Sequence, residues 1–330
     1  MALGIKRDRC LQIVGISKHQ FYHKPSGGKP GKRRSETTKV KQGETCELVE
    51  VSNEVVVDAV IALKQDVDQS DYYKLICIAL CLNGYYINHK KVYKLMRENG
   101  LLGEKNKRLN RKFVTQRRNN PSGPLRGLEM DIKYVYIEGA RKYAYVLTVI
   151  DTFTRYVLKW DVGYSMKSPK VRDLWEQLIV EYLQDRRPEL EPIDIEIRTD
   201  NGKQFVSKMI IQYFADNELN HVCIHPYTPE ENGHIESFHK TLGKAIEKDY
   251  FPDLASLAKR LTSFYDTYNN RRSHSSILGL PPKIFWTLYE NHYIEVIELK
   301  NDRKKFRLKV AYQDTMNLPC LRTKNRVIRA

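Results

Sequence analysis

The sequence predicts an α/β protein whose mixed β-sheet is covered by helices, with a small helical region before it and a short β-rich basic tail after it. Three observations predict this fold. Between residues 127 and 289, β-rich runs and helical stripes follow in the order three strands, helix, strand, helix, strand, helix. Apolar residues make up 41% of the chain, which is enough for a hydrophobic core. A length of 330 residues allows two or three domains.

The first 50 residues predict two short helices and a linker. Gly15 interrupts residues 1–24, and Ser17 is suited to cap the second helix. This pattern fits a small helix-turn-helix and equally an ordinary helical hairpin. Residues 25–50 are predicted to form a flexible basic linker, because a Pro- and Gly-rich stretch is followed by Lys32-Arg33-Arg34.

Residues 51–102 predict a helical domain. Apolar residues recur every three or four positions in its first helix, a second helix covers Tyr72 to Leu82, and a third ends at Asn99-Gly100. The tight turn at Asn83-Gly84 suits a helix-turn-helix whose last helix lies in a DNA groove, and a plain three-helix bundle with solvated lysines is the alternative. The candidate DNA contacts on the last helix are Lys90, Lys91 and Lys94.

Residues 103–126 are predicted to form an inter-domain linker that follows a nucleic-acid backbone. Glu104 is the only acid in this strongly basic stretch. A merely solvated run of charge is the default alternative. The candidate DNA contacts here are Arg108, Arg111, Lys112, Arg117 and Arg118.

The α/β core is predicted to cover residues 127–289. Gly139 and Asp151-Thr152-Phe153 mark the turns between its first three strands. The five predicted strands are 128–137, 142–150, 154–162, 193–197 and 221–225. One predicted helix starts at Ser168-Pro169, and three others cover residues 206–217, 232–249 and 254–270. Residues 290–330 alternate apolar and polar side chains and predict a basic C-terminal extension of short strands.

Charge and composition narrow the class of function. Lys and Arg total 56 against 40 Asp and Glu, a formal charge of +16, which predicts a polyanionic partner. Ribosomal and membrane-surface proteins are also basic, so charge alone does not separate these classes. No run of about 18 apolar residues predicts a membrane span, the N-terminus lacks a signal peptide, and the scattered cysteines fit a reducing, intracellular compartment.

Three carboxylates indicate a metal site. Asp131 interrupts an apolar strand, Asp200 ends the fourth strand, and Glu236 lies in the first turns of a helix, with 35 residues between the last two. Carboxylates from separate elements can converge at one rim of a sheet and are the hard ligands that Mg²⁺ prefers. We therefore expect Asp131, Asp200 and Glu236 to be both catalytic residues and ligands of two Mg²⁺ ions. A turn aspartate and a solvated helical glutamate are the plainer alternatives, and Asp151 is expected to be structural.

These residues resemble a known family. Asp131, the turn 199–202 and the segment 232–238 resemble the D,D(35)E pattern of retroviral-integrase-like transposases. Residues 268–282 look like the signature that closes this core in bacterial insertion-sequence transposases, and residues 87–101 are similar to the helix-turn-helix upstream of it. The resemblance covers roughly residues 70–285.

The resemblance implies a ribonuclease H-like core that cleaves and transfers DNA strands with Mg²⁺ or Mn²⁺, in a transposase of the second-reading-frame type. The implied partners are double-stranded DNA (terminal inverted repeats and target DNA), further copies of the chain and a partner reading-frame product, in the bacterial cytoplasm at the nucleoid. Further candidate DNA contacts are Asn232, His239, Lys240, Lys244, Arg271 and Arg272. Many relatives place a basic residue seven positions after the glutamate, where this chain has Gly243.

A zinc site and two other functions are alternatives to this interpretation of the chain as a transposase. His19, His23, Cys77 and Cys81 follow the order of an integrase zinc domain. The cysteines are separated by three residues within an apolar run, so core packing is the favoured interpretation. A catalytically inactive DNA-binding protein and a ribonuclease H-type nuclease without joining activity are the alternative functions.

Overall fold

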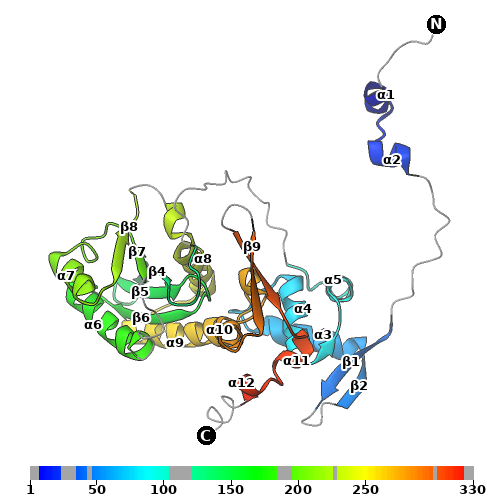
Figure 1. Cartoon of the computed structure of the whole chain (residues 1–330). Coiled ribbons are helices and arrows are strands. Elements are labelled where there is room, and N and C mark those ends of the chain that lie inside the picture. Colours follow the sequence, from blue (N-terminus) through cyan, green and yellow to red (C-terminus); the bar gives the residue numbers. More distant parts are fainter. Residues whose placement is uncertain are drawn as a thin grey trace. The chain divides into compact units, whose positions relative to one another are not determined.

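The computed structural model describes residues 7–23, 35–42, 47–103, 120–184, 195–225, 229–299 and 303–322 (Figure 1). The chain divides into two compact units between Glu36 and Thr37. In the described part of the chain, no helix is long and apolar enough to span a membrane.

The first unit contains two short helices, α1 (Arg7–Val14) and α2 (Lys18–Tyr22). Gly15 between them has a φ of +71°, a conformation that glycine adopts without a steric penalty. The Ser17 side chain accepts a hydrogen bond from the Gln20 backbone N–H, and the Gln20 side chain accepts one from the Ser17 N–H. This capping box confirms the helix break and the N-cap that the sequence predicts.

The second unit opens with a small sheet that the sequence did not predict. Strands β1 (Thr37–Gln42) and β2 (Glu47–Ser52) pair antiparallel, and β3 (Tyr85–Tyr86) adds to β1, giving the order β2-β1-β3. The prediction of a linker through residue 50 was therefore wrong for these strands. β1 has one apolar residue, Val40, so no apolar alternation marks it, and its second partner, β3, is far along the chain. Residues 24–34 and 43–46 of that linker lie outside the described residues.

Three helices follow as predicted, namely α3 (Asn53–Gln65), α4 (Tyr73–Leu82) and α5 (His89–Glu98). Their shared core contains fully buried Val56, Val60, Leu80, Val92 and Met96. Asn88 caps α5 by accepting a hydrogen bond from the Lys91 N–H. The tight turn at Asn83-Gly84 leads directly into β3, so the helices and the small sheet form one packed region.

A five-stranded mixed sheet forms the centre of the second unit. Its strands are β4 (Gly127–Ile137), β5 (Lys142–Asp151), β6 (Val157–Gly163), β7 (Glu196–Thr199) and β8 (Asn220–Cys223). The spatial order is β6-β5-β4-β7-β8, and β5 runs antiparallel to both of its neighbours while β4, β7 and β8 are parallel. The structure thus has the mixed five-stranded sheet that the sequence predicts.

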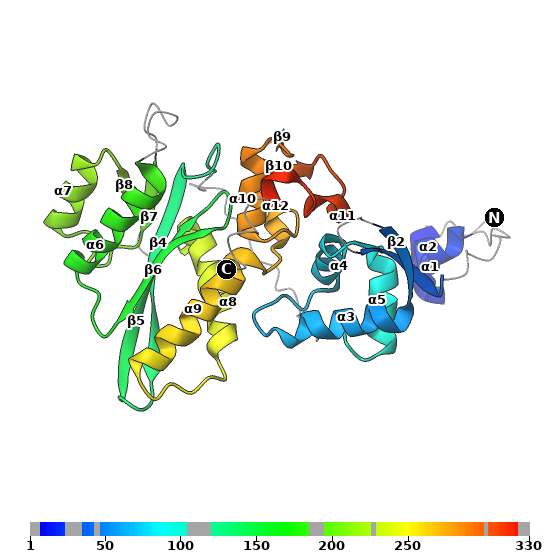
Figure 2. The same ribbon diagram turned by 90° about the horizontal axis from the view of Figure 1, so that it is seen from below.

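Helices cover both faces of the sheet (Figure 2). On one face lie α6 (Ser168–Leu178), continued by the π-helical turn Ile179–Leu183, and α7 (Lys208–Asp216). On the other face lie α8 (Gly233–Ile246) and α9 (Leu254–Asn270). The even-numbered β4 residues from 128 to 132 pack toward α6 and α7, whereas Val135 and Ile137 pack toward α8 and α9. This alternation decides which β4 side chains meet α8.

The third strand begins later than predicted. Residues 154–156 were expected in it, but β6 starts at Val157. The Asp151 side chain accepts hydrogen bonds from the Leu125 N–H, the Thr154 N–H and the Thr154 hydroxyl, and Arg155 has a φ of +65°. These bonds hold residues 151–155 in a turn, so Asp151 has the structural role expected of it.

The C-terminal segment packs as an additional layer. It comprises α10 (Pro282–Glu290), the antiparallel strands β9 (Ile294–Leu299) and β10 (Arg303–Leu308), and the short helices α11 (Tyr312–Thr315) and α12 (Pro319–Arg322). The predicted strands are present, and the two short helices were not predicted. Phe153, Phe285 and Phe306 pack together in its core. Residues 323–330 of the predicted extension lie outside the described residues.

Candidate active site

Asp131 lies on β4 and faces α8. It has the same parity as Val135 and Ile137, whose side chains pack on α8 and α9. One Asp131 carboxylate oxygen (Oδ2) is 3.3 Å from Nδ1 of His239 on α8, and the other (Oδ1) accepts a hydrogen bond from the Ile132 N–H. The strand alternation thus turns this carboxylate toward the helix that carries Glu236.

Asp200 follows β7 directly, beside Asp131. The last paired residues of the parallel β4–β7 ladder are Glu129 and Arg198, and each aspartate stands two residues beyond its own member of that pair. The pKa of Asp200 is raised, first by burial and also by the negative charge of Asp131, while the Gly202 N–H, 2.9 Å from Oδ1, opposes the rise. A cation held between these two carboxylates would offset the negative charge of Asp131 that Asp200 meets.

Glu236 lies in the first turn of α8, three positions before His239 and therefore on a neighbouring part of the same helix surface. Its Oε1 is 2.7 Å from Nζ of Lys240 one turn later, and both side chains are about half exposed. In the described residues, no three His, Cys, Asp or Glu side chains are gathered closely enough to hold a metal ion. The structure thus brings Asp131 and Asp200 together and leaves the Glu236 carboxylate with Lys240.

The candidate DNA contacts before the core fall into three groups. Lys90 and Lys94 are exposed on α5. The Lys91 ammonium instead donates to the Thr37 carbonyl and the Thr38 hydroxyl, both at 2.7 Å, so it helps to fasten β1 to α5. The remaining predicted contacts, Arg108, Arg111, Lys112, Arg117 and Arg118, lie outside the described residues.

The candidate DNA contacts within the core differ in their surroundings. Lys244 and Arg271 are exposed, although Arg271 also donates to the Thr267 hydroxyl at 2.7 Å. Asn232 is buried at the start of α8. His239 lies against Asp131, Lys240 pairs with Glu236, and Arg272 donates to the Asp68 carbonyl.

The two cysteines of the possible zinc site belong to a hydrophobic core. Cys77 and Cys81 are buried among the residues of α3, α4 and α5, and the sulfurs of both lie within 3.7 Å of the Ile87 carbonyl oxygen. His19 and His23 belong to the other unit. The packing of the cysteines agrees with the core interpretation.

Comparison with known proteins shows what the chain is similar to. An integrase core domain family matches residues 121–229, and a second integrase core domain family matches residues 217–282. The insertion element IS476 uncharacterized 39.2 kDa protein of Xanthomonas euvesicatoria is 29% identical over 205 residues, which are 62% of this chain and 56% of the relative. The transposase for insertion sequence element IS904 of Lactococcus lactis is 27% identical over 213 residues, which are 61% of this chain and 81% of the relative. The chain is thus similar to integrase core domains and to proteins of bacterial insertion sequences. It spans little more than half the length of the Xanthomonas relative.

The chain is also similar to solved viral proteins. The catalytic core domain of BIV integrase is 18% identical, with a TM-score of 0.38, and the match covers 51% of this chain and 97% of that one. A chain of the simian T-cell lymphotropic virus intasome in complex with PP2A regulatory subunit B56 gamma is 17% identical, also with a TM-score of 0.38, over 58% of this chain and 64% of that one. Asp131 and Asp200 fall in the first matched range and Glu236 in the second.

The sequence did not single out Glu129, which joins the five-stranded sheet to α8. Its side chain is fully buried on β4, two residues before Asp131 and on the same face. Oε2 accepts hydrogen bonds from the His234 N–H at 3.0 Å and the Ile235 N–H at 2.7 Å, two donors at the start of α8 that lack partners within the helix. Burial raises the pKa of Glu129 to about 7, while these two bonds and the charges of Arg155 and Arg198 oppose the rise. A buried acid in a strand is the signal that points to such a role.

We expect Glu129→Ala to lower strand transfer more than its effect on folding explains. The substitution leaves two buried N–H groups unpaired directly before Glu236, at a cost of about 1–3 kcal/mol, and lets the first turn of α8 fray. Urea unfolding and strand-transfer rates measure the two effects.

Glu138→Ala is the matched control for this prediction. Glu138 also accepts a backbone hydrogen bond, from the Phe251 N–H at 3.0 Å, but at a loop beyond the other end of α8. The control should lose stability and keep the transfer rate of its folded fraction. Equal transfer rates for the folded fractions of both variants would rule out the positioning role.

Lys133 occupies the space beside Gly243. A Cβ atom at Gly243 would lie 3.3 Å from Nζ of Lys133, a side chain on β4 two residues after Asp131. The chain therefore has a basic group next to the position where many relatives carry one, but it comes from the strand and not from the helix. Sequence spacing alone gives no sign of this exchange.

Proposed function

We propose that the chain catalyses metal-dependent cleavage and transfer of DNA strands at the ends of an insertion sequence, as a polynucleotidyl transferase. This proposal rests on the Asp131–Asp200 pair. The β4–β7 ladder holds the two aspartates side by side, next to the helix that bears Glu236. The similarity to an integrase core domain and to the transposase of insertion sequence element IS904 supports the same activity.

The donor set fits a divalent cation. Asp131, Asp200 and Glu236 offer hard oxygen ligands. Burial first, and then the negative charge of Asp131, raises the pKa of Asp200, and a cation would offset that charge. When bound, two Mg²⁺ or Mn²⁺ ions would favour attack by water or a 3′-hydroxyl and offset charge on the leaving oxygen. To bind a cation, the Glu236 carboxylate would have to leave Lys240. Both side chains are about half exposed, so a change of rotamer would separate them.

Basic side chains around the carboxylates would hold the DNA. Lys240 and Lys244 follow Glu236 on α8, and Lys133 follows Asp131 on β4. The formal charge of +16 supports a polyanionic substrate. We propose double-stranded DNA, both terminal repeats and target, as the partner, with further copies of the chain and a partner reading-frame product in the assembly.

Removal of the metal should abolish the activity. We expect a pre-cut duplex that carries the element's own end and a free 3′-hydroxyl to be joined to a target duplex with Mg²⁺ or Mn²⁺, and no joined product to form in EDTA. Denaturing gels of labelled ends measure the product. DNA binding in EDTA should persist. Hydrolysed but unjoined DNA would instead indicate a nuclease, and binding without any metal-dependent product would indicate an inactive DNA-binding protein.

A further inference from the structure

A cavity of about 440 Å³ opens beside the start of α8, and we call it the Arg155 pocket. It is lined by Arg155 after β5, by Ser237 and Thr241 of α8, and by residues of the segment Tyr268–Ser276, including Arg272. Within the described part of the chain, its lining carries two guanidinium groups and several hydroxyls but no carboxylate. Donors without acceptors suit an anionic ligand.

Arg155, which lines this pocket, has an unfavourable backbone conformation. Its φ of +65° is rare for a residue with a long side chain, and the Asp151 carbonyl accepts its N–H at 2.9 Å to close the turn. Strain of this kind persists where the surrounding structure fixes it, and it is frequent at ligand sites. The side-chain Nε donates to the Ser276 hydroxyl at 3.3 Å, which aims the guanidinium along the pocket wall.

One nitrogen of that guanidinium lacks an acceptor. Arg155 Nη1 is shielded from solvent and has no hydrogen-bond partner among the described residues. A charged donor buried in this way is costly unless a ligand completes it. Asp151 and Glu129 contribute negative charge near Arg155. The Asp151 oxygens accept bonds from residues 125 and 154 and Glu129 Oε2 from residues 234 and 235, whereas Glu129 Oε1 is buried and has no hydrogen-bond partner among the described residues.

The remaining groups at the pocket favour negative charge. α8 is 14 residues long and begins at Gly233 in the pocket wall, which adds the partial positive charge of a helix N-terminus. Arg272 adds a second guanidinium, although one of its nitrogens donates to the Asp68 carbonyl. Burial, with the charges of Arg272 and Arg155, lowers the pKa of His274 to about 3, so this lining residue is neutral.

We propose that the Arg155 pocket binds a backbone phosphate of the DNA strand that passes Glu236. This rests on the proposed function, because the DNA is its substrate. Ser237 and Thr241 connect the pocket to the catalytic helix, so a phosphate held there fixes the strand against α8. The ligand is a phosphodiester, contacted by the Arg155 fork and by hydroxyl donors.

The test measures DNA binding without metal. A fluorescent duplex of the element's terminal repeat is titrated in EDTA at several salt concentrations. Arg155→Gln should bind at least about tenfold more weakly. Its plot of log affinity against log salt should be shallower by about 0.9, the slope carried by one phosphate contact.

Arg141→Gln is the matched control. Arg141 also has a positive φ, +52°, but lies exposed in the turn between β4 and β5. It should leave the slope unchanged. An Arg155→Gln slope equal to that of the unaltered chain would overturn the pocket and leave the proposed function standing, whereas an unaltered chain without salt-dependent binding would contradict the proposed function itself.

A second measurement keeps the proposal testable if Arg155→Gln folds poorly. Arg155→Lys retains a charge without the planar fork, so its salt slope should stay near that of the unaltered chain while its affinity falls. Inorganic phosphate should raise the melting temperature of the unaltered chain above that in chloride of equal ionic strength, and should not do so for Arg155→Lys to the same extent. No phosphate effect in the unaltered chain, together with unchanged affinity in Arg155→Lys, would refute the site.

Discussion

Asp131→Asn, Asp200→Asn and Glu236→Gln should each reduce strand transfer by roughly 10³-fold or more, because each removes one anionic ligand from a site whose cations supply several kcal/mol. DNA binding in EDTA should remain within about twofold, since no phosphate-binding cation is lost. Strand-transfer gels and anisotropy titrations measure the two quantities. Full transfer activity in any one of the three variants would remove that residue from the catalytic site.

Two controls and a stability measurement separate a catalytic role from a structural one. Glu247→Gln and Asp216→Asn alter exposed carboxylates at the ends of α8 and α7, and both should transfer normally. Without metal, Asp200→Asn should be at least as stable as the unaltered chain, because the charge of Asp131 and burial both disfavour the ionised Asp200. A large loss of stability in this variant would instead indicate that Asp200 supports the fold.

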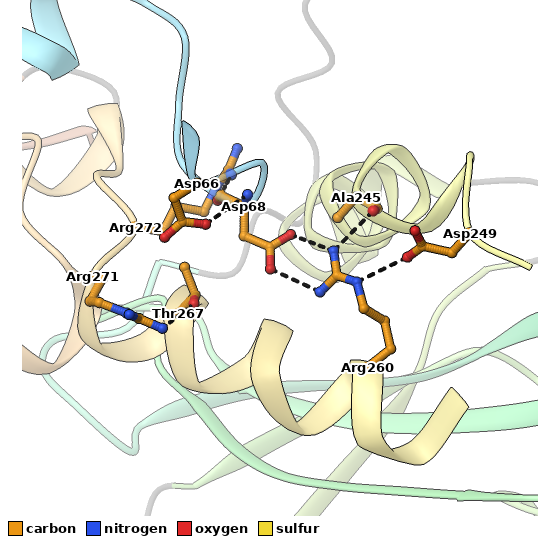
Figure 3. A network of polar contacts seen from close by, with 8 residues as sticks. All are labelled: Asp66, Asp68, Ala245, Asp249, Arg260, Thr267, Arg271 and Arg272. Carbon is orange, nitrogen blue, oxygen red and sulfur yellow. Dashed lines mark hydrogen bonds and ion pairs between the residues drawn. The ribbon is translucent and has the colours of Figure 1, made fainter. Parts of the chain in front are cut away.

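Asp68→Ala should release the region of α3 to α5 from the five-stranded sheet and its helices. Asp68 is 4% exposed, and its two carboxylate oxygens accept from Arg260 of α9 at 2.9 and 2.7 Å (Figure 3). Arg272 donates to its carbonyl oxygen. Because Arg260 is partly exposed and keeps Asp249 as a partner, the cost should be below the roughly 3–5 kcal/mol of breaking a fully buried pair.

In Asp68→Ala, the region of α3 to α5 should lose stability before the rest of the second unit does. Arg260 keeps bonds to Asp249 at 2.9 Å and to the Ala245 carbonyl at 3.0 Å, both close to the end of α8, so the sheet and α9 retain their own packing. Hydrogen exchange should therefore speed up in α3, α4 and α5 well before the five-stranded sheet. Urea unfolding should gain an early step.

Asp266→Ala is the matched control for this contact. Asp266 pairs with Arg271 at 3.4 Å on the surface of the same helix, and both side chains are more than half exposed. Such pairs contribute about 0–1 kcal/mol, so unfolding should stay single-step. If Asp68→Ala also unfolded in one step at an unchanged urea midpoint, the Asp68–Arg260 pair would not fasten the two regions.

A second close contact, between α4 and the segment 268–282, also joins the region of α3 to α5 to the rest of the second unit. Gly279 has a φ of +72°, and a Cβ there would lie 2.3 Å from Cδ1 of Ile78 on α4. The signature segment 268–282 thus carries a glycine where backbone and helix meet. The sequence shows the glycine but not its neighbour, which is about 200 residues earlier.

Local patterns were sufficient to predict most elements of the core. Alternation placed β4 and β5 within one residue of their observed ends, and the capping chemistry at Ser17 located the start of α2. Where a turn was stabilised by side chains, as at Asp151, the predicted strand began too early. Where pairing needed a distant partner, as in β1 with β3, the strand was predicted as a linker.

The sequence by itself determined the order of strands and helices, the resemblance to a family, and the three carboxylates worth testing, because periodicity, caps and motif spacing can be read along the chain. Only the tertiary structure decided that Glu129 caps α8, that Lys133 stands beside Gly243, that Asp68 binds Arg260, and that Arg155 lines a pocket and has a shielded nitrogen without a hydrogen-bond partner. Each of these depends on two segments that are distant in the chain and meet only when the sheet and helices pack, so no local pattern encodes it.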